Sequence, residues 1–340
     1  MPIDASLLKM KETVETDLIN IPGVVGVGVR NRKLVIYVEE AAPSIMSVIP
    51  ARVDDVPVMV RVTGKLQALA FMPMGTPRTG KFRPVPGGVS ISDPTCTAGT
   101  LGMWAKDKSG SACLVTNAHV IAINYATGEF NQPGTAVWQP GRYDGGGPED
   151  KIATFDRYAL DPSTENFVDG AVAYPDSPDI VLPEVLDDGV PIGMADAAAK
   201  MAVFKSGRTT GLTWTTITDV NASVKVSYPI GEIVFKDQIV FENPGGDVIA
   251  GGDSGSMLLS GAPPAVVGLC FAGSSSVGIA NKASRVVEAL GVDLGAAVVP
   301  TPPEGFAWSA VASAAIAAIP LSIIGSEEIR KYRKRGWAIG

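Results

Sequence analysis

The first seventy residues change from a helical to a β pattern of hydrophobic positions. Leu, Met and Val recur at helical spacing among Lys and Glu over residues 5–18, which predicts an amphipathic helix. Three β-rich runs follow, of which the first two are joined by a predicted hairpin turn at Asn31-Arg32; the runs are residues 23–30, 33–39 and 56–62. One helix and three strands predict a small α/β domain over residues 1–71.

The middle of the chain has the pattern of an all-β domain. Residues 72–88 contain four prolines and four glycines without an apolar period, which predicts a linker. From residue 89 to 296, short β-rich runs alternate with turns of Gly, Pro and Asp, as in a sandwich or a barrel. Residues 280–290 predict a short helix that ends at Gly291.

The tail, residues 297–340, differs from the rest in composition. Residues 305–325 carry no charge, and a basic segment follows after Ser326, so this run is long enough to cross a bilayer core. The alternative is an alanine-rich helix that packs against protein, because small residues dominate the run and Pro320 interrupts it. We therefore expect a hydrophobic helical tail with a basic end, a candidate for membrane contact or for self-association.

Composition narrows the classes of function. The chain has 340 residues, 46% of them hydrophobic, which is enough for two or three folded units. Its formal charge of −7 disfavours nucleic acid as a partner. Three cysteines without a C-x-x-C spacing support neither a disulfide framework nor a zinc site, and we expect no metal or cofactor. Because the start lacks the apolar run of a secretory signal, we expect a cytoplasmic protein, membrane-associated only if the tail binds a bilayer.

Three residues are candidates for chemistry. His119 is the single histidine, so any imidazole chemistry must use it. Asp169 stands between apolar residues at the start of a β-rich run and needs a hydrogen-bond donor, either a backbone N–H or an imidazole. Ser254 is framed by Gly252 and Gly255, which allow a sharp turn and leave backbone N–H groups uncovered. Each pattern alone also occurs in ordinary turns and strands.

In combination, these motifs resemble the trypsin/chymotrypsin-like serine protease family, in particular its bacterial members. The chain order His119, Asp169, Ser254 is the order of that family's triad. The similarity covers roughly residues 89–291. The segments that carry it are 114–120 (the T-A-A-H strand), 169–171 (D-[I/L]-A), 252–255 (G-D-S-G), 205–211 (the G-x-T-T-G turn) and 266–273 (the strand lining the specificity pocket).

The resemblance implies a mainly β chain with a chymotrypsin-like double β-barrel over residues 89–296. It also implies a protein or peptide substrate in the cleft between the barrels. By the family's triad logic, Ser254 is the nucleophile, His119 the general base, and Asp169 the group that orients His119. The N–H groups of Gly252 and Ser254 form the implied oxyanion hole.

The family's substrate pocket maps onto a small set of apolar residues. Since Val248, six before the nucleophile, is not a carboxylate, we expect a small or apolar P1 residue rather than Lys or Arg. The implied pocket residues are Val248, Ile249, Ala250, Phe271, Ala272 and Gly273. Many members have a serine beside the aspartate where this chain has Phe271, so Asp169 must find a second donor elsewhere.

The route of activation and the role of the flanking segments stay open. In many members a newly cleaved N-terminal amine pairs with the acid before the serine, here Asp253. The prolines of residues 83–89 disfavour cleavage there. Residues 1–71 are a candidate propeptide, adaptor or oligomerisation domain, the last of which implies a homo-oligomer. The alternative function is a catalytically silent protease-fold binding or scaffold protein, with or without a membrane tether through its C-terminal tail.

Overall fold

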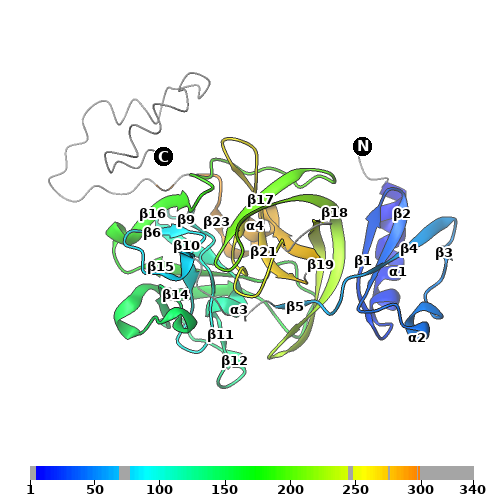
Figure 1. Cartoon of the computed structure of the whole chain (residues 1–340), viewed down its shortest axis with the longest axis horizontal. Helices are drawn as coiled ribbons and strands as arrows, with labels where there is room; N and C mark the ends of the chain where they lie inside the picture. The colour runs from blue at the N-terminus through cyan, green and yellow to red at the C-terminus, as the bar shows by residue number, and fades with distance from the viewer. Residues whose placement is uncertain (1–4, 69–76, 244–247, 275, 297, 299–340) are drawn as a thin grey trace.

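The computed structural model describes residues 5–68, 77–243, 248–274, 276–296 and 298, which form three strand-rich parts in a row (Figure 1). The N-terminal domain lies at one end, and the long β18–β19 hairpin (Gly211–Tyr228 and Gly231–Glu242) lies beside it. Most of the predicted tail, residues 297–340, lies outside the described residues. Within the described part, no helix is both long and apolar enough to span a membrane.

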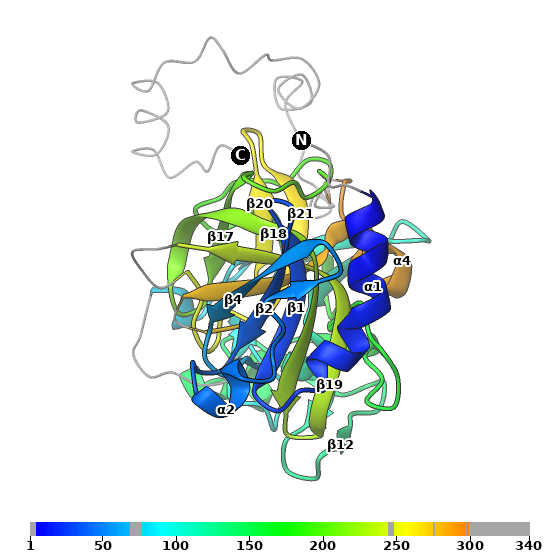
Figure 2. The same ribbon diagram turned by 90° about the vertical axis from the view of Figure 1, so that its right-hand side faces the viewer.

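The N-terminal domain is a helix on a small sheet. The predicted helix and the three predicted strands are confirmed, and Asn31 and Arg32 form the hairpin turn with φ values of 51° and 59°. The elements are α1 (Ala5–Ile19), β1 (Val24–Arg30), β2 (Lys33–Val38), α2 (Pro43–Met46), β3 (Arg52–Val53) and β4 (Val56–Val62). Helix α1 runs alongside β1 (Figure 2), and apolar residues of the helix and of the sheet, such as Leu7 and Ile36, are buried in one cluster.

The first barrel is a six-stranded sheet closed by a short hairpin. Its sheet order is β13-β14-β15-β10-β9-β23. The β7–β8 hairpin closes it, because Ser92 bridges Trp138 and the N–H of Gly102 donates to the carbonyl of Val115 at 3.0 Å. The strands are β7 (Ser90–Ile91), β8 (Gly99–Thr100), β9 (Met103–Asp107), β10 (Ala112–Thr116), β13 (Ala136–Trp138), β14 (Lys151–Ala159), β15 (Gly170–Pro175) and β23 (Val292–Asp293).

Short elements connect these strands. They are η1 (Pro77–Thr79), β6 (Val85–Gly87), α3 (Ala118–Ile121), β11 (Ile123–Asn124), β12 (Glu129–Phe130), η2 (Arg142–Asp144), η3 (Pro148–Asp150), η4 (Pro178–Ile180) and β16 (Val181–Val185). The linker prediction is wrong for residues 85–87, because this stretch is a buried strand that pairs with β16. Proline is tolerated there because a short strand with one partner needs few N–H donors.

The second barrel is a closed ring of six strands. In ring order they are β17 (Ala202–Gly207), β20 (Met257–Ser260), β21 (Ala265–Gly273), β22 (Val277–Lys282), β19 and β18, and β18 pairs back with β17. Helix α4 (Ala283–Leu290) follows and ends at Gly291 with φ 64°, as predicted, although it starts later than expected because β22 continues to Lys282. The two barrels confirm the predicted mainly β, chymotrypsin-like fold.

The N-terminal domain shares its sheet with the second barrel. Strand β1 pairs antiparallel with β18, with Gly26 opposite Val224 and Val27 opposite Ser223. Strand β5 (Gln67–Ala68) pairs with both β18 and β21. The junction also holds a fully buried carboxylate, Asp219, and Gly28 leaves room for it, since a Cβ at Gly28 would lie 1.9 Å from Asp219 Oδ2. Burial raises the pKa of Asp219 to about 6.

Candidate active site

The first barrel supplies a paired histidine and aspartate. His119 lies in the short helix α3, which begins two residues after the end of β10, and Asp169 immediately precedes β15. The distance from His119 Nδ1 to Asp169 Oδ2 is 2.6 Å, and the backbone N–H of His119 donates to Asp169 Oδ1 at 3.2 Å. Both residues are fully buried. This contact fixes the imidazole with its Nε2 atom facing away from the carboxylate.

Asp169 has the second donor that the sequence left open, and the donor is Tyr228. The hydroxyl of Tyr228, the last residue of β18, donates to Asp169 Oδ2 at 2.8 Å. Burial raises the pKa of Tyr228 well above its usual value, and the charge of Asp169 raises it further, so the phenol keeps its proton. The ring of Tyr228 also lies edge-on to His119, with 5.7 Å between the centroids.

Two asparagines fix the backbone of Asp169. Asn117 Nδ2 donates to the Asp169 carbonyl at 2.7 Å, and the Asp169 N–H donates to Asn281 Oδ1 at 3.1 Å. The side chain of Asn281 in turn donates to Gln238 at 2.7 Å. All four residues are buried, so Asp169 is held through partners from both barrels.

The second barrel supplies the serine on a glycine-rich loop. Gly252 and Gly255 have φ values of 96° and 98°, which other residues rarely adopt. A Cβ at Gly255 would lie 2.1 Å from the carbonyl of Thr100. Thr100 holds the loop in turn: its hydroxyl donates to the Gly252 carbonyl and its N–H to the Ser254 carbonyl, both at 2.7 Å.

The predicted oxyanion donors have a defined direction. The carbonyl of Gly251 accepts from Thr209 Oγ1 at 2.5 Å, and the carbonyl of Asp253 accepts from the N–H of Ser256 at 3.0 Å. In a trans peptide the N–H points opposite to the carbonyl. The N–H of Gly252 therefore points away from Thr209, and that of Ser254 away from Ser256. Their role as an oxyanion hole stays a prediction.

Ser254 and His119 are not hydrogen-bonded to one another through His119 Nε2. Ser254 Oγ donates to the carbonyl of Phe271 at 3.3 Å. The buried Nε2 atom of His119 has no hydrogen-bond partner among the residues that the structure describes. Catalytic hydrogen bonds are often long or unformed before substrate binds, so this geometry is compatible with a resting enzyme.

Asp253, the acid before the serine, pairs with a lysine inside the protein. Lys205 Nζ lies 3.2 Å from Asp253 Oδ2, and both side chains are fully buried. The carboxylate also accepts from the N–H groups of Ala250, Thr209 and Thr210 at 2.9, 2.8 and 3.1 Å. An internal cation thus pairs with the carboxylate that, by the resemblance, was expected to pair with a newly cleaved amine.

The predicted pocket residues divide between two parts of the core. Val248 and Ile249 are buried in one apolar cluster, and Ile249 lies against Gly273, where an added Cβ would meet it at 2.6 Å. Phe271 instead packs against Phe235, with 4.7 Å between ring centroids, and Ala272 belongs to the same cluster as Phe271. The side chain of Phe271 thus lies apart from Val248 and Ile249.

The three cysteines are poor candidates for a competing nucleophile. All are buried and reduced. Burial raises the pKa of Cys113 and of Cys270 to about 12, and that of Cys96 still further. A thiol with such a pKa is protonated at neutral pH and reacts slowly. Among the described residues, no group of His, Cys, Asp and Glu side chains could hold a metal ion.

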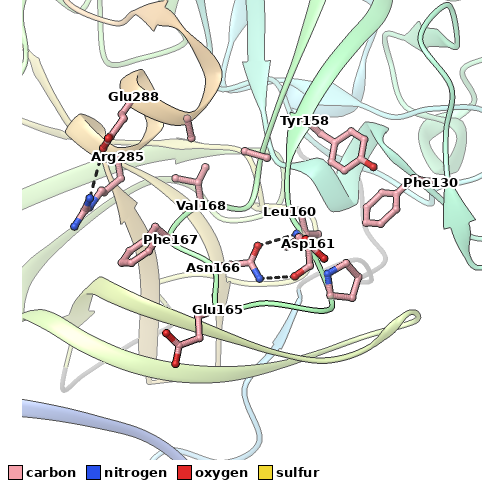
Figure 3. A pocket seen from close by; sticks show the side chains of 13 residues that line it. Phe130, Tyr158, Leu160, Asp161, Glu165, Asn166, Phe167, Val168, Arg285 and Glu288 are labelled. Carbon is pink, nitrogen blue, oxygen red and sulfur yellow. Dashed lines mark hydrogen bonds and ion pairs between the residues drawn. The ribbon is translucent and has the colours of Figure 1, made fainter. Parts of the chain in front are cut away.

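A separate hollow of about 740 Å³ lies beside helix α4 (Figure 3). Its walls include the stacked rings of Phe130 and Tyr158, 4.5 Å apart, and Arg285, whose guanidinium lies 4.6 Å from the Phe167 ring centroid. None of the predicted site residues lines it. The hollow is therefore distinct from the His119–Asp169 pair.

Comparisons with known proteins return protease structures. No model of a protein family matches the sequence, and no curated protein matches it. Among solved structures, NAPase of Nocardiopsis is 20% identical, with a TM-score of 0.46 over 62% of this chain and 99% of that chain. The chymotrypsin of Cellulomonas bogoriensis is 21% identical, with a TM-score of 0.44 over 64% and 99% of the two chains. Protease A of Thermobifida fusca is 19% identical, with a TM-score of 0.45 over 62% and 97%.

Proposed function

We propose that this protein is a serine endopeptidase that hydrolyses peptide bonds through Ser254, His119 and Asp169. The observation that carries the proposal is the buried contact of 2.6 Å between His119 and Asp169, which leaves Nε2 of His119 as the available base. A histidine fixed in this way, together with a serine on a glycine-framed loop, supplies the base and the nucleophile that acyl transfer needs.

In the proposed reaction, rotation about χ1 of Ser254 turns its hydroxyl from the Phe271 carbonyl toward His119. Ser254 Oγ then forms a bond to the scissile carbonyl carbon while Nε2 of His119 takes the hydroxyl proton. The carbonyl π electrons move to the oxygen, which accepts from the N–H groups of Gly252 and Ser254. The C–N bond breaks, and the leaving amine takes the proton from His119. Water then repeats the sequence on the acyl-enzyme, with His119 again as the base.

The remaining residues support this chemistry indirectly. Asp169 stabilises the imidazolium that forms, and Tyr228 and the two asparagines hold Asp169 in place. The Lys205–Asp253 pair supports a loop geometry that needs no new N-terminal amine. The apolar character of Val248 and Ile249 supports a small or apolar P1 residue. We propose no cofactor.

A fluorophosphonate probe tests the proposal directly, because it reacts with activated serines. We expect labelling of the full chain at Ser254, located by peptide mass spectrometry, and none in Ser254→Ala. Ser256→Ala is the matched control, since Ser256 lies two residues along the same loop. Absence of labelling in both the wild type and the control would refute the proposal and favour a catalytically silent binding protein.

A further inference from the structure

The strand next to the nucleophile is already paired with another segment of the chain. Strand β21 runs beside the Ser254 loop: the N–H of Gly255 donates to the carbonyl of Cys270 at 2.9 Å, and Ser254 Oγ donates to the carbonyl of Phe271. The next two residues of β21 pair antiparallel with β5, with Ala272 opposite Ala68 and Gly273 opposite Gln67.

The direction of β5 leads toward the nucleophile. Because the pairing is antiparallel, the chain passes from Gly273 to Ala272 as it proceeds from Gln67 to Ala68, and so approaches Phe271 and Ser254. An extended peptide that binds to a strand in this way receives backbone hydrogen bonds that do not depend on its side chains. Strand β5 therefore covers the backbone that such a peptide would use.

The segment is anchored at its N-terminal end. Gln67 also pairs in parallel with Ser227 of β18, and the N–H of Ser227 donates to the carbonyl of Leu66 at 3.4 Å. The side chain of Leu66 is 2% exposed and belongs to the same apolar cluster as Phe271. Strand β5 thus fills the gap between β18 and β21 rather than lying loosely on the surface.

We propose that β5 is an internal, substrate-like strand that blocks the peptide-binding edge of β21 and restrains the proposed protease. This inference rests on the proposed function. The entering substrate is an extended peptide that must displace residues 66–68 before its scissile bond reaches Ser254. Reagents too small to pair with β21 react without this displacement.

Proline substitutions in β5 test the restraint in the full chain. Gln67→Pro/Ala68→Pro removes both N–H groups, so the pairing is lost. The matched control, Gln67→Ala/Ala68→Ser, keeps both N–H groups. We expect kcat/KM for a tetrapeptide anilide to rise at least about tenfold in the proline variant, mainly through KM, and to stay at the wild-type value in the control. The rate of Ser254 labelling by a small sulfonyl fluoride should be equal in all three proteins.

Each outcome decides a different question. Equal kcat/KM in the three proteins, with normal labelling, would overturn the inference and leave the proposed function standing. Absence of labelling in every protein would overturn both.

A second measurement uses the wild-type chain, so it tests the inference even if the proline variant misfolds. In the wild type, a tetrapeptide boronate should increase hydrogen exchange at residues 66–68, whereas the sulfonyl fluoride should not. Unchanged exchange with the boronate bound would contradict the inference.

Discussion

Removing the hydroxyl of Tyr228 is the most direct test of how the residues around Asp169 are organised. In Tyr228→Phe, Asp169 Oδ2 loses its donor at 2.8 Å but keeps its contact with His119 Nδ1. A hydrogen bond to a charged group contributes about 1.5–3 kcal/mol, and here both partners are buried, so water cannot replace the lost donor. If the whole loss falls on the transition state, the rate decreases by about 10- to 150-fold.

The assay separates positioning from simple destabilisation. Because Tyr228 contacts Asp169 rather than the proposed substrate edge, we expect kcat to fall and KM to stay nearly constant. Tyr37→Phe is the matched control: this tyrosine is 2% exposed, and its hydroxyl has no hydrogen-bond partner among the described residues. The control should keep wild-type kinetics. A kcat of Tyr228→Phe within twofold of the wild-type value would refute the assignment of Tyr228 as the residue that supports Asp169.

Three further predictions concern buried charge and the loop. Lys205→Met should lower the free energy of unfolding, measured by thermal denaturation, by about 3–5 kcal/mol, because it leaves the carboxylate of Asp253 buried without its cation. The double variant Lys205→Met/Asp253→Asn should recover part of this loss. Burial raises the pKa of Asp219 to about 6, so in the folded protein this carboxyl keeps a proton that the unfolded chain loses above about pH 4. As the pH rises from 4 to 6, the free energy of unfolding should therefore fall by up to about 3 kcal/mol. Denaturant titrations of Asp219→Asn at a series of pH values should lack this fall. An equal pH dependence of the free energy of unfolding in the variant and in the wild type would contradict the reasoning. Gly255→Ala should abolish Ser254 labelling, whereas Gly110→Ala, with a similar φ of 85° and no atom within 4 Å of the added Cβ, should retain it.

Local patterns predicted the parts of this structure that depend on neighbours in sequence. The hairpin at Asn31-Arg32, the end of α4 at Gly291 and the glycine frame of Ser254 follow from a few adjacent residues. Strand residues 85–87 were missed because prolines mask a short buried strand, whose burial depends on its pairing with β16.

The supporting residues of the site could not be predicted, because they come together only when both barrels close. Tyr228 lies 59 residues from Asp169 in sequence, and Asn281 lies 112 residues away. Nothing in the local sequence of either marks it as a partner of the aspartate. Lys205 stands in a segment that resembled a family turn, but its burial against Asp253 is a property of the folded loop.

The pairing of β1 with β18 makes the N-terminal domain part of the sheet of the second barrel. The first third of β18, Gly211–Thr216, has its second neighbour in β17, but at Ser223 and Val224 that neighbour is β1. Removal of the N-terminal domain would therefore leave an open sheet edge on an otherwise closed barrel. Exposed edges of this kind pair readily with strands of other molecules, so we expect a chain without the N-terminal domain to self-associate through β18.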